Sequence, residues 1–307
     1  MIIQKISSCS PILISILLVM VSACHLKHEP DETNLIKAKA LLASRFTGLE
    51  DFKNTVELSY SRKDSSSRVI ISYKSNGQLV QSTLASGITE QDIMNGKNGT
   101  FKEKASLVLQ TPFGIRNRVA LQKVFILARR MRFITGEKDV AFYRLAELSA
   151  NKINTRVAFT NKRDSSEKGY INTFNHITAQ AIITALFSEE IADYIADCHE
   201  LNAMPALTTG KFTLDQLADT LNYPVDNYVD LLNNEIGQEL GKALAIKYNI
   251  DELTVWSPTL LADFLNDIHS YYKWSFGIGM DPYLSSEEDI IEYSKKLNNV
   301  RLRKVYF

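Results

Sequence analysis

The sequence predicts an α+β fold, with a small antiparallel β meander in the N-terminal half and a mainly α-helical C-terminal domain that contains an αα-hairpin. Alternating apolar and polar residues, many of them β-branched, occupy 55–61 and 68–84, as in half-buried strands. Beyond residue 170 the apolar residues recur with helical periodicity. A chain of 307 residues, 45% of them hydrophobic, is also long enough to bury a full core.

The first 34 residues are predicted to be a targeting segment. Lys5 precedes an uncharged apolar run over 11–23, which is shorter than the roughly 20 residues that span a bilayer. This pattern is typical of the core of a signal peptide, and the alternative is an uncleaved anchor or a buried N-terminal helix. We expect a signal peptide over 1–23 and a short polar tether over 24–34.

The apolar run ends in Val21-Ser22-Ala23-Cys24. This block resembles the lipobox of bacterial lipoproteins, which implies cleavage before Cys24 and attachment of diacylglycerol to its sulfur. Because each buried CH₂ contributes about 0.8 kcal/mol, two or three acyl chains would hold the protein on a membrane. In that family an Asp after the cysteine favours inner-membrane retention, but His25 stands here, so the expected location is the outer membrane. Cys198 would then be the single unmodified cysteine of the mature chain, which leaves no intrachain disulfide.

The charge balance excludes one large class of partner. Lys plus Arg and Asp plus Glu both number 35, so the chain has no global basic field that would hold a phosphate backbone. We therefore expect no nucleic-acid partner. The chain also carries no GxGxxG, GxxxxGK[ST], HExxH or GxSxG motif, which are the local signatures of common nucleotide-binding and hydrolytic enzymes.

The folded chain divides into a mixed α/β region over 35–165 and a helical domain over 166–307, joined by the polar loop 160–170. In the first region, Asn76-Gly77 predicts a type I′ hairpin turn, because both central residues of that turn need positive φ. The other elements expected there are a short helix over 35–45, a loop at 96–99 and a helix over 117–133.

The segment 172–200 separates its reactive groups, with His176 near one end and an Asp-x-His-Glu block at the other. A single helix would hold His176 and His199 about 35 Å apart. Ser188 argues against that, because it is a good N-cap and two acids follow it in the first turn of a new helix. We predict an αα-hairpin at Ser188, which sets His176 beside Glu200.

The second arm of this hairpin carries the acidic part of the candidate site. Asp197 and Glu200 share a helix face. His199 lies about 200° from Asp197 on a regular helix, so these two converge only if the helix ends near Cys198. The alternative is a polar hairpin face in which His176 is a hydrogen-bonded core or boundary residue.

A third helix is predicted to begin at Pro224, which suits a first helical turn. Asp230 and Asn233 lie on a stripe that continues into Gly237 and Gly241. Because each glycine costs about 1 kcal/mol in a helix interior, their presence predicts close approach of another helix. That approach would press Asp230 and Asn233 toward the neighbouring helix.

Three blocks in order resemble the signature of an uncharacterised bacterial domain family found in exported proteins and in some toxin-like polyproteins. The family pattern is Asn-x-x-Arg-His-Ala, Asp-x-His-Glu and Asn-Asn-x-x-Gly. The blocks here, within about 170–245, are Asn172-x-x-Asn175-His176, Asp197-x-His199-Glu200 and Asp230-x-x-Asn233-Asn234-x-x-Gly237. Asn175 replaces the usual Arg, and Ile177 replaces a small residue. The family has no established reaction, so the resemblance implies where a site lies and not what it does.

Three kinds of chemistry suit this cluster. A divalent transition metal with bound water would make a hydrolytic centre. Alternatively, His176 is a general base oriented by Asp197 or Glu200, or the cluster is a buried hydrogen-bond network that specifies helix packing. The candidate metal ligands are His176, His199, Glu200 and Asp230, and the candidate catalytic residues are His176, Asp197, His199, Glu200, Asp230 and Asn233.

The sequence therefore predicts a membrane-anchored bacterial lipoprotein of the cell envelope, whose partner is the membrane through lipid on Cys24. Its polar cluster is expected to be a binding or structural site. The alternative is a metal-dependent or His-dependent hydrolase acting in the cell envelope.

Overall fold

A computed structural model describes residues 36–63, 66–155, 159–219 and 223–302. The predicted signal peptide, Cys24 and the tether lie outside these residues. The described residues belong to one compact unit, Ile36–Phe307, in which the mixed and helical regions of the sequence pack against each other. Among the described residues, no helix is both long enough and apolar enough to cross a membrane.

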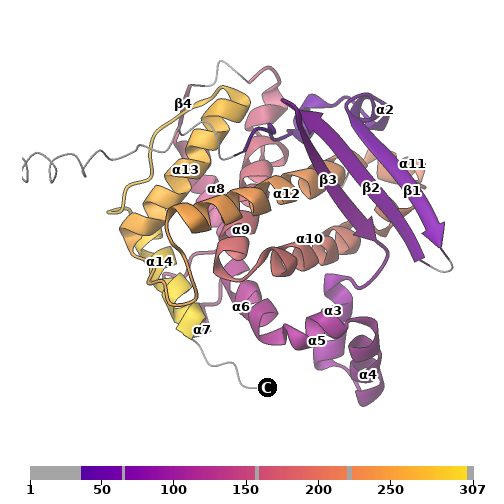
Figure 1. Ribbon diagram of the computed structural model, residues 1–307, viewed down its shortest axis with the longest axis horizontal. Helices are drawn as coiled ribbons and strands as arrows, with labels where there is room; N and C mark the ends of the chain where they lie inside the picture. Colours follow the sequence, from indigo (N-terminus) through magenta and orange to yellow (C-terminus); the bar gives the residue numbers. More distant parts are fainter. Residues whose placement is uncertain (1–35, 64–65, 156–158, 220–222, 303–307) are drawn as a thin grey trace, which may run out of the picture. The chain divides into compact units, whose positions relative to one another are not determined.

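The fold is α+β, as predicted, and the strands of the first region form an antiparallel meander in the order β1-β2-β3 (Figure 1). Asn76 and Gly77 turn the chain between the second and third strands with φ of 49° and 79°, which confirms the type I′ turn. A short pair, β4 with β5, joins the two halves of the chain. The strands are β1 (Val56–Lys63), β2 (Ser66–Ser75), β3 (Gln78–Ala85), β4 (Ile153–Thr155) and β5 (Gly279–Met280).

Helices make up most of the remaining structure. In the first region they are α2 (Leu49–Lys53), α3 (Glu90–Asn98), α4 (Phe101–Gln110), α5 (Pro112–Arg116), α6 (Arg118–Ala128), α7 (Arg132–Thr135) and α8 (Phe142–Asn151). In the second they are α9 (Asn172–Leu186), α10 (Glu189–Ala203), α11 (Leu214–Ala218), α12 (Pro224–Lys247), α13 (Pro258–Phe276) and α14 (Glu288–Leu302). Short 3₁₀ or π turns occur at Ala43–Arg45, Lys162–Ser165, Glu167–Ile171 and Pro205–Thr208.

The expected helix over 35–45 was wrong for its described part. Only Ala43–Arg45 is helical, as a single 3₁₀ turn. The residues before it are extended, because side chains from other elements occupy their backbone groups: the Ala40 N–H donates to Ser275 and the Leu41 N–H donates to Asn233. Tertiary hydrogen bonds have therefore outweighed a local helical preference.

Two other local predictions need correction. The expected loop at 96–99 is largely helical, since α3 continues to Asn98 from a capping box made by Thr89 and Asp92. The expected helix over 117–133 ends at Ala128, where Arg129 is extended. The buried Asp139 carboxylate accepts the Met131 N–H just beyond that point, which gives the interrupted backbone a partner outside the helix.

The αα-hairpin predicted at Ser188 is confirmed. Helix α9 ends at Leu186, and the Ser188 hydroxyl accepts the Ile191 N–H at 3.3 Å to begin α10. Helix α10 continues to Ala203, so it does not end near Cys198 as convergence of Asp197 and His199 would have required.

Helices α9 and α12 run parallel and in close contact. Three side-chain pairs join them, Asn172 with Asp230, His176 with Asn234 and Gln180 with Gln238, and each pair is separated by 58 residues. A constant separation means that both helices advance in the same direction. Helix α12 also packs against α10 and β3 (Figure 1), and most of its side chains are buried.

Glycines permit this contact, as the sequence predicted. A Cβ on Gly237 would lie 2.7 Å from the Ile177 carbonyl oxygen, and a Cβ on Gly241 would lie 2.5 Å from that of Ala181. Real side chains do not tolerate such distances from a rigid backbone atom. The two glycines therefore set the distance between α9 and α12.

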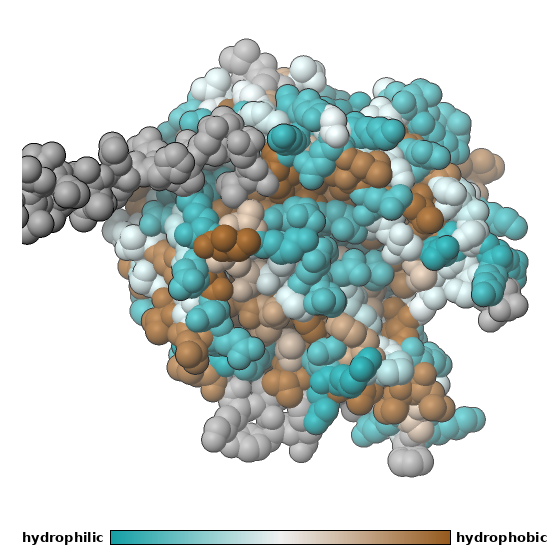
Figure 2. All heavy atoms as spheres, in the orientation of Figure 1, coloured by the Kyte–Doolittle hydropathy of each residue, from teal (hydrophilic) through white to brown (hydrophobic). Residues whose placement is uncertain are grey.

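Apolar side chains fill the interior and also reach the surface in places. Phe174, Ile177, Leu232 and Ile236 are buried in α9 and α12. Figure 2 shows apolar residues exposed on one face, including the α3–α5 segment at its lower right. Exposed residues of that segment include Val108 and Leu109 on α4.

Gly241→Ala tests the helix contact. Helix propensity alone would favour alanine by about 1 kcal/mol. We instead expect a loss of about 1–3 kcal/mol in the free energy of unfolding, because the new methyl group meets the Ala181 backbone. Urea unfolding measures this loss of stability. Gly87→Ala is the control, because a Cβ on Gly87 would lie 3.7 Å from its nearest neighbouring atom. A Gly241→Ala protein at least as stable as the wild type would show that α9 and α12 do not pack this closely.

Candidate metal centre

His176 on α9 makes a side-chain contact with α12. Its Nδ1 lies 3.0 Å from the Oδ1 of Asn234. With the amide oxygen of Asn234 facing the ring, Nδ1 carries the proton and Nε2 keeps a lone pair. Burial, reinforced by the charge of His199, holds the pKa of His176 down to about 4, so the ring is neutral near pH 7. A neutral imidazole with a free Nε2 is the form that binds metals.

The Nε2 lone pair faces Asp230. The nearest carboxyl oxygen of Asp230 is 3.4 Å from Nε2, and the Asn172 amide nitrogen donates to both oxygens of that carboxyl at 3.0 Å. In the tautomer with the proton on Nδ1, Nε2 has no proton to donate, so Nε2 and the Asp230 carboxyl oxygen are two acceptors 3.4 Å apart. A cation placed beside them would turn this unfavourable contact into a favourable one.

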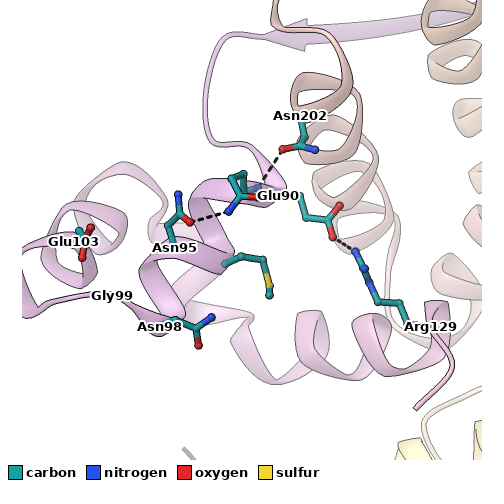
Figure 3. Close-up of a pocket in the computed structure, with 9 residues that line it drawn as sticks. Glu90, Asn95, Asn98, Gly99, Glu103, Arg129 and Asn202 are labelled. Carbon is teal, nitrogen blue, oxygen red and sulfur yellow. Dashed lines mark hydrogen bonds and ion pairs between the residues drawn. The ribbon is translucent and has the colours of Figure 1, made fainter. Parts of the chain in front are cut away.

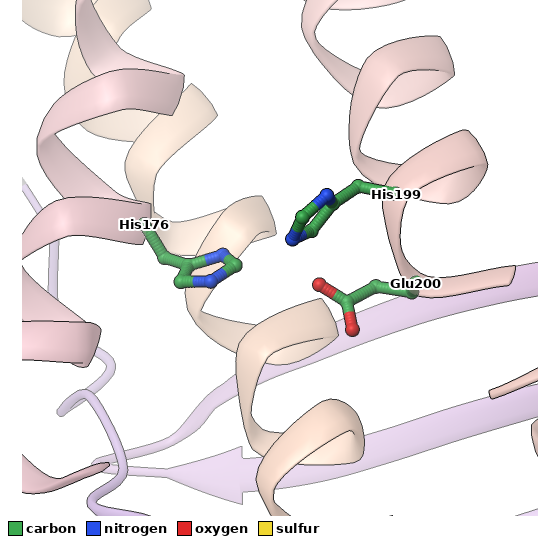
Figure 4. A group of neighbouring side chains, drawn as sticks. All are labelled: His176, His199 and Glu200. Atoms are coloured by element: carbon green, nitrogen blue, oxygen red, sulfur yellow. The ribbon is translucent and has the colours of Figure 1, made fainter. Parts of the chain in front are cut away.

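Helix α10 brings two further donors to the same place. Ligand atoms of His176, His199 and Glu200 all lie within 4.8 Å of one another, and Figure 4 shows the three side chains pointing toward one another. The two imidazole rings have centroids 6.1 Å apart. Glu200 is 2% exposed, whereas the His199 side chain is 58% exposed. The cluster is therefore buried on one side and accessible to solvent on the other.

One buried carboxyl oxygen of Glu200, the Oε1 atom, lacks a hydrogen-bond partner among the described residues. Burial, followed by the charges of Asp230 and Asp226, raises the pKa of Glu200 well above its usual range. A buried polar atom without a partner costs about 1–3 kcal/mol, and a metal ion would supply the missing partner.

The neighbourhood is rich in carboxyl groups. Burial and the charge of Asp230 raise the pKa of Asp226 to about 7. Lys168 lies beside these acids and forms an ion pair of 3.2 Å with Asp226. A divalent ion would offset the remaining excess of negative charge.

The donor set fits a transition metal such as Zn²⁺. Two donors on one tetrahedral Zn²⁺ ion are about 3.4 Å apart, because the bond lengths are near 2.0–2.1 Å. The ligand atoms here lie within 4.8 Å of one another, so small side-chain rotations would bring them to the distance that zinc requires. Imidazole nitrogen and carboxylate oxygen are both common zinc ligands. The donation from His176 Nδ1–H to the Asn234 carbonyl oxygen is also the usual support for a metal-binding histidine.

Of the predicted site residues, Asp197, Asp230 and Asn233 lie outside the group formed by His176, His199 and Glu200. Asn233 is fully buried, and its amide pairs with the backbone of Leu41, accepting the N–H at 3.0 Å and donating to the C=O at 2.9 Å. This contact gives Asn233 a structural role. Burial, followed by the charges of Asp193 and Glu235, raises the pKa of Asp197 to about 8. Asp197 therefore belongs to a second acidic group, formed by Asp193, Asp197 and Glu235 on α10 and α12.

No local pattern in the sequence indicates Glu90, which the structure brings to the site. Its Oε2 lies 3.6 Å from Nδ1 of His199. Glu90 also lines a cavity of about 620 Å³ between α3, α4 and the ends of α6 and α10, together with Arg129 and Asn202 (Figure 3). Glu90 is remote from the three blocks in the sequence, so only tertiary structure reveals the contact.

Comparisons with known proteins do not assign a family. No family model, curated protein or solved structure matches this chain. The resemblance of the three blocks to a domain of exported bacterial proteins stays a prediction. The geometry of the site and the N-terminal sequence are therefore the observations that bear on function.

Glu235→Gln tests the raised pKa in the second acidic group. Burial raises the pKa of Glu235 to about 7 against an ordinary value of 4.5, so the folded state binds this proton more tightly than the unfolded state does. Stability is then lost as the pH rises from about 4.5 through 7. We expect Glu235→Gln to increase the free energy of unfolding at about pH 8.5 and to change it little at about pH 4.

Urea unfolding at the two pH values measures this difference. Glu137→Gln is the control, because that side chain is 87% exposed, and it should have the same small effect at both. An equal gain from Glu235→Gln at both pH values would rule out the proposed ionisation penalty.

Proposed function

We propose that this protein is a membrane-anchored bacterial lipoprotein whose α9–α10–α12 cluster binds a divalent transition metal. The observation that carries the proposal is the convergence of His176, His199 and Glu200 within 4.8 Å, with a buried Glu200 oxygen that has no hydrogen-bond partner among the described residues. His176 contributes Nε2, because its Nδ1 is engaged by Asn234. Asp230, 3.4 Å from that Nε2, is the candidate for a fourth ligand.

A metal-dependent hydrolase is the second candidate. Zinc sites with three protein ligands keep a position for water, and the metal lowers the pKa of that water to about 7. The exposed His199 ring supports this alternative, because it leaves one side of the cluster open to solvent. The same metal centre serves both candidates, so metal binding is the first property to test.

The proposed anchor is supported by the apolar run over 11–23 and by the Val21-Ser22-Ala23-Cys24 block that follows it. Lipid on Cys24 would hold the protein on a membrane, and His25 in the next position favours the outer membrane. The metal cluster would then work in the cell envelope.

Variants of the cluster test metal binding. The wild-type protein, purified in detergent, should bind about one Zn²⁺ and unfold at a higher temperature with Zn²⁺ present, since a ligand at 100 times its Kd stabilises by about 2.7 kcal/mol. His176→Ala and Glu200→Gln should each lose most of this affinity. Calorimetric titration and thermal unfolding measure both effects, with Glu189→Gln on α10 as the control.

A different result would favour the structural alternative. If Zn²⁺, Co²⁺, Ni²⁺ and Mn²⁺ neither bind the wild type nor raise its unfolding temperature, the cluster is a hydrogen-bond network. His176→Ala should then cost about 1–3 kcal/mol of stability, because it leaves Asn234 without its buried partner.

Cys24→Ser tests the anchor separately. The substitution removes the sulfur to which the lipid would be attached, so the protein should leave the membrane fraction and lose labelling by a radioactive fatty acid. Cys198→Ser is the matched control and should keep both. Unchanged labelling of the Cys24→Ser protein would disprove the lipoprotein assignment.

A further inference from the structure

Glu90 is held between the candidate metal centre and the cavity beside it. The capping box of Thr89 and Asp92 fixes the start of α3, so Glu90 lies in the first helical position. One carboxyl oxygen forms an ion pair with Arg129, and the other lies 3.6 Å from Nδ1 of His199. Figure 3 shows the Glu90 side chain directed toward Arg129.

A hydrogen bond between the α3 backbone and an α10 side chain joins the two helices at this point. The Gln91 N–H donates to Oδ1 of Asn202 at 3.3 Å, and Asn202 follows His199 by three residues on the same helix. Residues three apart lie on neighbouring positions of a helix surface. Glu90 is therefore placed beside His199 by a fixed contact between the two helices.

His199 needs such support more than His176 does. His176 is enclosed between α9 and α12, whereas the His199 side chain is 58% exposed, so packing restricts its ring less. A carboxylate beside Nδ1 places the proton on that nitrogen and leaves Nε2 with the lone pair. The same arrangement occurs at His176, where the Asn234 oxygen accepts from Nδ1.

We infer that Glu90 is a positioning residue of the metal centre, whose carboxylate accepts the Nδ1–H of His199 and directs Nε2 of that ring at the metal. The inference rests on the proposed metal-binding function. It adds α3, from the N-terminal region, to a site whose other members come from α9, α10 and α12. Carboxylate–histidine–metal arrangements of this kind typically contribute a factor of 10–100 to metal affinity.

A double-mutant cycle tests the inference on the full chain in detergent. Zn²⁺ affinity is measured by competition with a chelating dye in the wild type, Glu90→Ala, His199→Ala and the double variant. Alanine is used because glutamine would keep an oxygen that accepts the Nδ1–H of His199. We expect Glu90→Ala to weaken affinity by about 10–100-fold in the wild-type background. In the His199→Ala background the same substitution should change affinity by less than about 3-fold, because the group that Glu90 positions is gone.

The cycle separates positioning from two simpler effects. Removing a negative charge weakens cation binding through space, and loss of the Arg129 ion pair perturbs the fold, but both effects would persist without His199. Glu103→Ala is the matched control: Glu103 lines the same cavity, but its carboxylate accepts from the backbone and hydroxyl of Thr100. This control should bind Zn²⁺ as the wild type does.

The outcomes also distinguish this inference from the function on which it rests. A wild type that binds no metal overturns both. A wild type that binds Zn²⁺, with Glu90→Ala either unchanged or equally weakened with and without His199, overturns only the role of Glu90. The Co²⁺ absorption spectrum gives a second readout: a shifted ligand-field band in Glu90→Ala is expected, and an unchanged band in a protein of weakened affinity contradicts positioning.

Discussion

The close parallel contact between α9 and α12 is the constraint on which the rest of the site depends. Gly237 and Gly241 allow α12 to meet the backbone of α9 near Ile177 and Ala181. At this distance short polar side chains reach across the interface and pair. The pairs are Asn172 with Asp230, His176 with Asn234 and Gln180 with Gln238. Larger side chains at positions 237 and 241 would push the two helices apart and break these hydrogen bonds.

This interface sets both the tautomer and the surroundings of His176. Asn234 fixes the proton on Nδ1 and Asn172 holds the Asp230 carboxyl near Nε2. Because Asn234 and Asp230 are buried, each polar atom there that no described residue pairs with is costly, and the Nδ2 of Asn234 is one such atom. The hairpin at Ser188 then brings Glu200 and His199 to the open side of the same ring. A preformed donor set of this kind loses little entropy when a metal binds.

Local signals in the sequence predicted much of this arrangement. Ser188, Asn76-Gly77 and the glycines of α12 act through backbone geometry within a few residues, and the structure agrees with all three. His176, His199 and Glu200 follow from the hairpin once its corner is known. Asp230 follows from its place on the glycine stripe of α12.

Residues whose roles depend on distant segments could not be predicted. Asn233 looked like a site residue because it shares a helix face with Asp230, but the extended segment near Leu41 pairs with it. The sequence predicts a helix for the same segment, because no local pattern shows that the side chains of Ser275 and Asn233 accept hydrogen bonds from its backbone N–H groups. His199 converges with Glu200 and not with Asp197, and Glu90 reaches it from a separate helix. Long-range contacts of this kind depend on tertiary packing and leave no periodic pattern in the sequence.

The most direct test of the central claim is anomalous X-ray diffraction at the zinc absorption edge, on crystals of the protein grown with Zn²⁺. The structure predicts one strong anomalous peak at about 2.0–2.2 Å from Nε2 of His176 and from ligand atoms of His199 and Glu200. A crystal without a peak between α9 and α10, or with zinc bound only at surface residues elsewhere, would contradict a metal centre in this cluster.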